Sequence, residues 1–247
     1  MMMNPTIELL KSHRSIRKFT KEPITPELFQ QLLSAGQAAA SSSFIQAATI
    51  LRITNTSKRL KLAQLANDQQ YVASAAEFLV ICADLHRAVQ CCEQHGETAR
   101  PGFTEQTIIA TVDAALVAQN IVVAAESAGL GICYIGALRN KPDEVSELLD
   151  LPEYVYAVFG LCIGWPDQDP EVKPRLPLEI ILHENSYKKD QGWSALSGYD
   201  DVIKSYYEAR TENKKSQTWS SQMAGLLGRE ARPHMLNFLN KKGLLKR

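Results

Sequence analysis

The first two thirds of the chain contain short apolar runs, which predict strands, and one long apolar segment, which predicts a helix. Residues 77–84 (EFLVICAD) are almost continuously apolar, as is typical of a strand buried on both faces. Residues 48–54 are rich in β-branched side chains, and the runs at 132–136 and 155–165 also predict strands. Residues 105–128 are apolar nearly all round, so we expect a helix inside the protein or at a subunit interface. The polar interruptions of this segment are Asp113, Gln119 and Asn120.

Capping residues mark two further helices. Asn4 followed by Pro5 is a favourable helix start, and the apolar residues after it predict a short helix with one apolar side. Thr25 is suited to the N-cap of a second helix, with Pro26 at its first position. Gly36 is then predicted to end that helix as a C-terminal glycine.

Three other segments complete this part of the chain. Residues 141–152 have the amphipathic pattern of a helix. Residues 38–46 are small and polar and predict a loop, and residues 87–104 also predict a loop. Helices and strands therefore mix up to Trp165, which predicts a compact core of mixed α and β structure without internal repeats.

The composition changes after Trp165. Residues 166–177 (PDQDPEVKPRLP) contain four prolines, and the last fifty residues or so are polar with a helical pattern. We expect a single domain over residues 1–247. Its core would span about 1–165, and a basic helical excursion with a C-terminal extension would span about 166–247.

The overall composition excludes some classes of partner. Of 247 residues, 45% are apolar and 22% are charged, and 27 Lys and Arg balance 27 Asp and Glu. A net charge of zero argues against binding of nucleic acid or membrane surfaces through bulk charge. No apolar run has signal-peptide length or approaches the roughly 18 residues of a membrane span. The odd number of five cysteines predicts reduced thiols and a cytoplasmic protein.

The motifs of several common chemistries are absent. There is no G-x-G-x-x-G dinucleotide fingerprint, no Walker-type phosphate loop and no G-x-S-x-G nucleophile elbow. His86, Cys91, Cys92 and His95 are metal-ligating residue types, but adjacent cysteines suit a single zinc ion poorly. We interpret them as part of a polar surface loop with free thiols, and we predict no metal site.

A local cationic segment, SHRSIRKF at residues 12–19, follows the first predicted helix. Its cations or potential cations are His13, Arg14, Arg17 and Lys18. A solvated basic helix end would explain it, because cations complement the helix dipole. A second basic stretch, with Lys173 and Arg175 in a proline-stiffened loop, favours instead a phosphate site, since arginine binds phosphate in a bidentate manner. From the residues alone, both interpretations stay open.

Six short stretches occur in order from about Pro5 to the C-terminus: HRSIRKF, SSSFIQ, GLGICYIGALRN, FGLCIGWP, KPRLP and HENSY. Together they resemble the FMN-dependent nitroreductase superfamily, especially its NADPH-preferring branch of oxygen-insensitive nitroreductases and flavin reductases. The resemblance implies an α+β nitroreductase fold, in which helices wrap a mixed, mainly antiparallel central sheet. It also implies one FMN-binding domain per chain and an intertwined homodimer with a C-terminal helical excursion and FMN at the interface.

The same resemblance implies which residues bind FMN at its phosphate and polar ends. Those implied to hold the ribityl phosphate are His13, Arg14, Ser15, Lys173 and Arg175. Arg17 would reach N1 and O2 at the pyrimidine end of the flavin. Gln69 would bond the polar edge of the ring.

Two further segments would lie beside the flavin ring. The serine loop that the second subunit would bring to the flavin consists of Ser41, Ser42 and Ser43. The segment packing by the ring, where a backbone N–H would approach N5, consists of Tyr134, Ile135 and Gly136. Ala137 stands where the family commonly has a second glycine.

The resemblance also implies an NADPH site in the tail. Arg210 matches an arginine that the NADPH-preferring branch uses for the 2′-phosphate, and Lys214 and Lys215 add positive charge close by. Lys215 stands where that branch often has arginine, and lysine cannot make the same bidentate contact. Arg232 matches a further candidate for the adenosine end. A solvated, charged helix end is the alternative explanation of this tail.

The implied function is an NADPH-dependent FMN oxidoreductase. Hydride would pass from NADPH through N5 of FMN to nitroaromatics, quinones or free flavin by a ping-pong mechanism. Arg17 would stabilise the negative charge of reduced flavin, and Gly136 would help to orient N5. The cofactor carries the chemistry, so no acid–base pair is required. The alternative is a flavin-binding or flavin-storage protein without significant turnover, and the physiological acceptor is not identified by the sequence.

Overall fold

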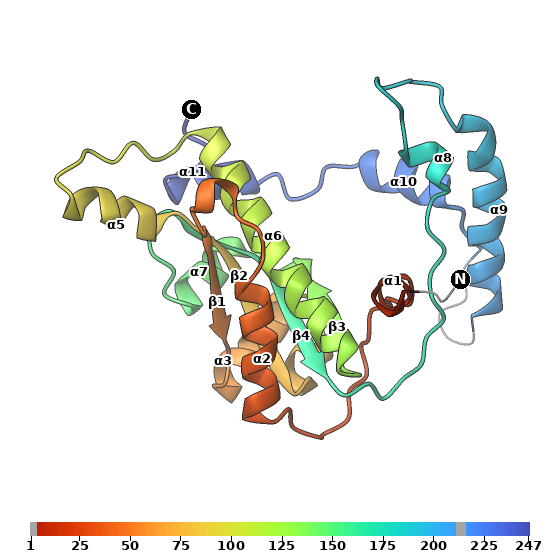
Figure 1. Cartoon of the computed structure of the whole chain (residues 1–247), viewed down its shortest axis with the longest axis horizontal. Helices are drawn as coiled ribbons and strands as arrows, with labels where there is room; N and C mark the ends of the chain where they lie inside the picture. The colour runs from red at the N-terminus through yellow and green to blue at the C-terminus, as the bar shows by residue number, and fades with distance from the viewer. Residues whose placement is uncertain (1–3, 211–215) are drawn as a thin grey trace. The chain divides into compact units, whose positions relative to one another are not determined.

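The structure, a computed structural model, describes residues 4–210 and 216–247. The chain divides into two compact units, whose elements are labelled in Figure 1. The first unit comprises Met1–Pro170 and His234–Arg247, and the second comprises Glu171–Pro233. Each unit has a hydrophobic core of its own.

A four-stranded antiparallel sheet forms the centre of the first unit. Its strands are β1 (Ala48–Arg52), β2 (Glu77–Asp84), β3 (Gly131–Ile135) and β4 (Val155–Gly164). Their order across the sheet is β1-β2-β4-β3, and all four overlap segments that the sequence predicts as strands. β2 pairs with β1 and β4, and all its residues except Asp84 are buried. The predicted central strand, buried on both faces, is therefore confirmed.

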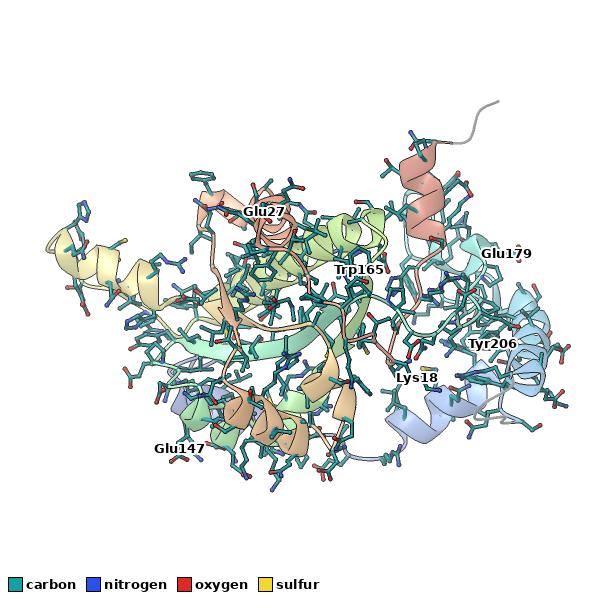
Figure 2. The ribbon with its side chains drawn as sticks, turned by 90° about the horizontal axis from the view of Figure 1, so that it is seen from below. Lys18, Glu27, Glu147, Trp165, Glu179 and Tyr206 are labelled. Atoms are coloured by element: carbon teal, nitrogen blue, oxygen red, sulfur yellow. The ribbon has the colours of Figure 1, made fainter. Side chains whose placement is uncertain are left out.

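Helices cover both faces of this sheet, and side chains fill the space between the layers (Figure 2). On one face lie α2 (Pro26–Gln37) and α6 (Thr104–Ser127). On the other face lie α3 (Thr56–Leu65), α4 (Gln70–Ser74) and α7 (Pro142–Leu148). Successive side chains of a strand point to opposite faces, so Leu79 and Ile81 of β2 join the first core, while Phe78 and Val80 join the second. This layering confirms the predicted α+β fold class.

α6 is the long apolar helix that the sequence predicts. By length and composition it could cross a membrane, but it packs against α2 and the sheet as a core helix does. Each of its polar interruptions has a specific partner. Gln119 accepts a hydrogen bond from the Tyr134 hydroxyl at 3.2 Å, and Asn120 donates one to the Ala35 carbonyl at 3.0 Å. The third interruption, Asp113, is buried and binds the loop before β1.

The predicted caps are confirmed, but the role predicted for Gly36 is wrong. Asn4 caps α1 (Pro5–Lys11), and the Thr25 side chain caps α2. Gly36 lies inside α2 and does not end it. A Cβ at this position would lie 2.5 Å from Cγ1 of Ile121 on α6. The glycine is therefore required for the close approach of the two helices.

The loop predicted at residues 87–104 is only partly a loop. Helix α5 (His86–Gln94) occupies its first part, and 95–103 contains no helix or strand. α5 has no buried residue, so it lacks the continuous buried face by which a helix is usually recognised in a sequence. α3 and α4 correspond to no predicted element, although Asn55 caps α3 through the Lys58 N–H at 2.9 Å. Within the loop at 38–46, residues form the short 3₁₀ turn η1 (Ser42–Phe44).

The second unit is helical. It contains α8 (Leu178–Ile181), α9 (Trp193–Ala209) and α10 (Trp219–Leu227). One face of α9 forms its core through Tyr199, Ile203 and Tyr207, which follow one another at intervals of four residues. Asp200 on the same helix accepts a hydrogen bond from the Ser220 N–H at 2.9 Å, which fixes the start of α10.

The last helix returns to the first unit. α11 (Met235–Lys241) places Phe238 and Leu239 in the core formed by the sheet, α2 and α6. A second 3₁₀ segment, η2 (Gly136–Asn140), follows β3 directly.

Candidate functional site

The cationic segment at residues 12–19 runs along β3 in the first unit. The Ile16 N–H donates to the Ile132 carbonyl at 2.8 Å, and Ser15 forms a parallel bridge with Ile132. Gly131 permits this approach, because a Cβ there would lie 2.5 Å from Cγ1 of Ile16. The backbone that carries the predicted phosphate ligands is therefore held by the sheet.

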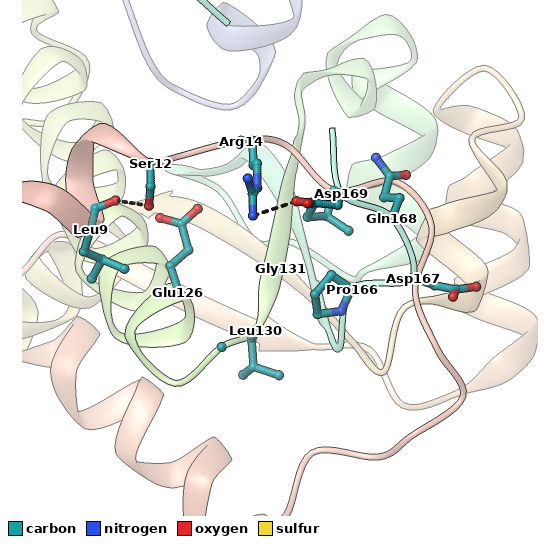
Figure 3. A pocket seen from close by; sticks show the side chains of 12 residues that line it. Leu9, Ser12, Arg14, Glu126, Leu130, Gly131, Pro166, Asp167, Gln168 and Asp169 are labelled. Atoms are coloured by element: carbon teal, nitrogen blue, oxygen red, sulfur yellow. Dashed lines mark hydrogen bonds and ion pairs between the residues drawn. The ribbon is translucent and has the colours of Figure 1, made fainter. Parts of the chain in front are cut away.

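Arg14 lines a pocket of about 580 Å³ in the first unit (Figure 3). Its guanidinium lies 2.8 Å from the Asp169 carboxylate, as the dashed line in Figure 3 marks. The neighbouring His13 places Nδ1 2.6 Å from the carboxylate of Glu126, whose side chain is only 12% exposed. Two of the predicted phosphate ligands, His13 and Arg14, thus contact carboxylates of the same unit.

Arg17, in the same segment, lies near Tyr71 and Cys133. The guanidinium donates a hydrogen bond to the Tyr71 hydroxyl. Burial raises the pKa of Tyr71, and the charge and hydrogen bond of Arg17 reduce that rise. Burial likewise raises the pKa of the Cys133 thiol, and Arg17 opposes the rise. Arg17 therefore places a positive charge beside a partly buried surface at β3 and α4.

Gln69 stands directly before α4, two residues from Tyr71. Its side-chain Oε1 is buried and has no hydrogen-bond partner among the residues that the structure describes. A buried acceptor without a donor costs about 1–3 kcal/mol, so such a group usually marks the place of a ligand or water. The imide N–H of an isoalloxazine ring is a suitable donor, so this acceptor fits FMN.

Tyr134, Ile135 and Gly136 lie where β3 passes into η2. The Tyr134 side chain points toward α6 and Phe159, whose ring centroid is 5.0 Å away, while Ile135 packs into the core on the opposite face. Burial raises the pKa of Tyr134 to about 12, and Glu126 adds to the rise. On the face near Arg17, Tyr134 therefore offers only its backbone. Gly136 leaves the guanidinium of Arg139 3.3 Å from the place of a Cβ.

The serine loop is fixed by Asp113, a residue that sequence reasoning did not assign to the site. The Asp113 carboxylate accepts hydrogen bonds from the Ser41 hydroxyl at 2.6 Å, the Ser42 N–H at 3.1 Å and the Ala47 N–H at 3.0 Å. The loop between them is strained, because Ser43 has a φ of 48° and its neighbour Phe44 one of 58°. The sequence feature that could have pointed to Asp113 is its position as a single aspartate in a largely apolar helix.

Two predicted cations of the second unit, Lys173 and Arg210, contact tyrosine side chains. Lys173 Nζ donates to the Tyr207 hydroxyl at 2.7 Å, and an Arg175 N–H donates to the Lys173 carbonyl at 2.9 Å. The Arg210 guanidinium lies 5.9 Å from the ring centroid of Tyr206 and 6.0 Å from that of Tyr207.

Three other cations, Arg232, Lys214 and Lys215, are predicted for the NADPH site. Arg232 belongs to the second unit and has a φ of 54°. Lys214 and Lys215 lie outside the described residues. Among the predicted cations that the structure describes in this unit, Lys173 and Arg210 contact the same tyrosine, Tyr207.

The first unit also groups some of the predicted residues and separates others. Arg17 lies beside Tyr71, and Gln69 precedes Tyr71 by two residues, while Arg14 lines the 580 Å³ pocket. Ser41 lines a different pocket of about 870 Å³, between α2, α6 and β1. Arg14 and the serine loop therefore line two different pockets of the described part of the chain.

The chain is thus an α+β protein in which a cationic segment runs along the edge strand β3 and the buried Gln69 acceptor has no partner among the described residues. Residues 10–165 match the Nitroreductase family, and residues 173–247 match the Nitroreductase family, C-terminal domain. The chain therefore belongs to the nitroreductase family, as the sequence resemblance predicts.

Similar proteins extend this likeness over the whole chain. The chain is 50% identical over 245 residues to an NADPH-flavin oxidoreductase of Vibrio harveyi, covering 99% of this chain and 100% of that protein. It is 45% identical over 242 residues to an oxygen-insensitive NADPH nitroreductase of Salmonella typhimurium, covering 98% of each. The solved structure of the NADPH:FMN oxidoreductase from Vibrio harveyi complexed with NAD+ matches with a TM-score of 0.91 and 48% identity, covering 99% of this chain and 100% of that one. The nitroreductase fold is thereby confirmed.

Proposed function

We propose that this protein is an NADPH-dependent FMN oxidoreductase that acts on nitroaromatics, quinones or free flavin. Its similarity to an NADPH-flavin oxidoreductase and an NADPH nitroreductase over nearly the full length supports this function. In the structure, the observation that carries the proposal is the buried Gln69 Oε1 without a partner among the described residues. When bound, FMN supplies the centre that accepts and donates hydride, N5, so the chain needs no acid–base pair of its own.

Arg17 is the proposed tuning residue. A fixed cation near the pyrimidine end of a flavin stabilises the negative charge that reduction places there. Arg17 is oriented for this task by its hydrogen bond to Tyr71, which lies on the helix that Gln69 precedes. Tyr134, Ile135 and Gly136 would contribute backbone groups beside the ring.

His13, Arg14, Ser15, Lys173 and Arg175 are the proposed phosphate ligands. Arg14 would exchange its carboxylate partner for the phosphate, which carries more charge and accepts a bidentate contact. The exchange is favourable for Arg14 because Asp169 has a side chain that is 83% exposed and can turn to water, and exposed ion pairs contribute at most about 1 kcal/mol.

A homodimer is proposed because α6 leaves one apolar stripe exposed. Ile108, Val112 and Leu116, spaced by four residues on one side of the helix, are 52%, 50% and 40% exposed. Phe44 at the tip of the serine loop is 82% exposed. A second copy would cover these side chains. The serine loop, which lines a pocket other than that of Arg14, would then serve the flavin of the partner.

The tail is proposed to select NADPH. Arg210 would bind the 2′-phosphate with help from Lys214 and Lys215, and Arg232 would contact the adenosine end. We also propose that residues 1–247 act as one FMN-binding domain in the cytoplasm, with small molecules as electron acceptors.

Steady-state assays of the purified protein test this function. NADPH and NADH are compared as donors against a nitroaromatic, a quinone and FMN. We expect turnover with a lower KM for NADPH than for NADH. Arg210→Ala should raise the KM for NADPH while the KM for NADH and the FMN content stay nearly unchanged. Bound flavin without turnover with either nicotinamide would contradict the enzyme and favour a flavin store.

A further inference from the structure

Tyr207 occupies the centre of the second unit, between two cations that the proposed function assigns to different ligands. Its side chain is buried in the core with Tyr199 and Ile203. Its hydroxyl accepts a hydrogen bond from Lys173 Nζ at 2.7 Å and donates one to Gln222 Oε1 at 3.2 Å. The lone pair that Lys173 uses is thereby oriented by Gln222 on α10.

The same helix face also holds the chain next to Lys173. The Tyr199 hydroxyl, two turns before Tyr207 on α9, donates to the Pro174 carbonyl at 3.1 Å. Leu176 packs against the core formed by these tyrosines. The segment that carries Lys173 and Arg175 is therefore fastened at its backbone by Tyr199 and at its lysine by Tyr207.

Arg210, the cation proposed for the 2′-phosphate of NADPH, stands over the ring of the same residue. Its guanidinium carbon is 6.0 Å from the Tyr207 ring centroid, within the range of a cation–π contact. Lys173 Nζ is itself 5.0 Å from that centroid. Burial alone would raise the pKa of Tyr207, but the hydrogen bond and charge of Lys173, with smaller contributions from Gln222 and Arg210, lower it.

We propose that Tyr207 is a positioning residue for both cofactor phosphates: its hydroxyl holds Lys173 for the FMN phosphate, and its ring holds Arg210 for the 2′-phosphate of NADPH. The inference rests on the proposed function, because both cations are ligands only if FMN and NADPH bind. A lysine ammonium has three N–H donors, so the bond to Tyr207 leaves two of them for phosphate. Side chains that are ordered before binding lose less conformational entropy when the ligand arrives.

The hydroxyl and the ring have separate tasks, so two substitutions separate them. Tyr207→Phe removes the hydroxyl and keeps the ring, whereas Tyr207→Leu removes both. Tyr187→Phe, an exposed tyrosine of the same unit, is the matched control. The apoprotein of each variant is titrated with FMN and with riboflavin, which lacks the phosphate, and folding is checked by thermal melting.

For Tyr207→Phe, the affinity for FMN should fall by roughly 2- to 10-fold, the range expected for one lost hydrogen bond. The affinity for riboflavin should stay unchanged, because Lys173 acts only on the phosphate. In a Lys173→Met background, Tyr207→Phe should have no further effect. An unchanged FMN affinity, or an equal loss for FMN and riboflavin, would overturn the role of the hydroxyl. If Tyr207→Phe melts early, Gln222→Leu, which removes the acceptor that orients the same hydroxyl, should lower the affinity for FMN and leave that for riboflavin unchanged, and unchanged affinities for both would overturn the role of the hydroxyl.

The ring is tested by kinetics with the two nicotinamides. Tyr207→Leu should raise the KM for NADPH more than that for NADH, while Tyr207→Phe should change neither. Equal increases for both donors in Tyr207→Leu would show a general structural defect and contradict the role of the ring. If wild-type apoprotein binds FMN no more tightly than riboflavin, the proposed phosphate site fails at that first step, which separates its failure from that of Tyr207.

Discussion

Two side chains with incomplete or unusual surroundings support the flavin site most strongly. Gln69 buries an acceptor that has no donor among the described residues, and Arg17 places its charge against the partly buried Tyr71. The unmet acceptor of Gln69 costs free energy when no donor is bound, and Arg17 is an exposed residue whose charge is accessible to a ligand. A bound ring with an imide N–H and a developing negative charge would satisfy both.

The charge of Arg17 should be visible in the redox potential of the bound flavin. Arg17→Gln should lower the two-electron midpoint potential by roughly 30–60 mV, because a lost charged hydrogen bond costs about 1.5–3 kcal/mol. The potential is measured by anaerobic reduction against a reference dye. Arg14→Gln, which removes a cation at the phosphate end, should weaken FMN binding and leave the potential unchanged. Equal potentials for wild type and Arg17→Gln would remove Arg17 from the site.

Asp113 should control how well the serine loop serves the flavin. Asp113→Asn keeps the volume but removes acceptor capacity from three donors, so we expect a loss of about 1–3 kcal/mol of unfolding free energy. FMN should also dissociate faster from this variant than from wild type, as followed by flavin fluorescence after dilution. Glu105→Gln, at an exposed position of the same helix, is the control. A destabilised variant with the FMN dissociation rate of wild type would show that Asp113 serves the fold alone.

The sequence predicts the cations of the site but not their partners. The residues of HRSIR are adjacent in the chain, as are the serines of the serine loop, so each group is visible as a local pattern. Asp113 acts on residues 66 to 72 positions away, and Glu126 contacts His13 across 113 positions. Such contacts are made by tertiary folding, so no local pattern reveals them. Asp113 was noticeable only as a carboxylate in an apolar helix.

At the level of helices and strands, the sequence predicts the elements that have a local signal and misses features that depend on tertiary packing. The strands, α1, α2, α6 and α7 follow from apolar periodicity and caps. α5 escapes such reasoning because it buries no residue, and Gly36 was misassigned because its role depends on Ile121, which is distant in sequence. Helix ends chosen from glycine alone are unreliable where two helices approach closely.

The contact between α2 and α6 should tolerate no added methyl group. Gly36→Ala should lower the unfolding free energy by about 1–3 kcal/mol, since overpacking of a core forces side chains and backbone to shift. Ile121→Val should restore part of this loss in the double variant. Gly198→Ala in α9 is the control, because no described atom lies within 4 Å of the added Cβ and alanine favours the helix. Urea unfolding of the four proteins measures the effect, and equal stabilities at both glycine positions would contradict the packing argument.

The whole molecule is expected to be a dimer because its longest helix is only half covered by its own chain. The exposed stripe on α6 adjoins the anchor of the serine loop, Asp113, so one interface would bury the stripe and deliver the loop together. Obligate interfaces of this kind bury a few thousand Å² and are more apolar than other surfaces.

Charge on the stripe should therefore separate the subunits. Ile108→Asp together with Val112→Asp should give monomers in light scattering and should release FMN, because the serine loop of the partner is lost. Leu60→Asp, at an exposed apolar position on α3, should leave a flavin-loaded dimer. A monomeric variant that retains the FMN content of wild type would contradict a flavin site shared between subunits.

One anaerobic reaction shows whether this chain passes electrons from NADPH to a bound FMN. Purified protein is mixed with NADPH in a stopped-flow spectrometer, and the yellow absorbance of its flavin is followed without any acceptor. We expect bleaching within seconds, slower bleaching with NADH at the same concentration, and recovery of the colour when a quinone is added. A flavin that stays yellow in excess NADPH would show that the protein binds flavin without accepting electrons from NADPH.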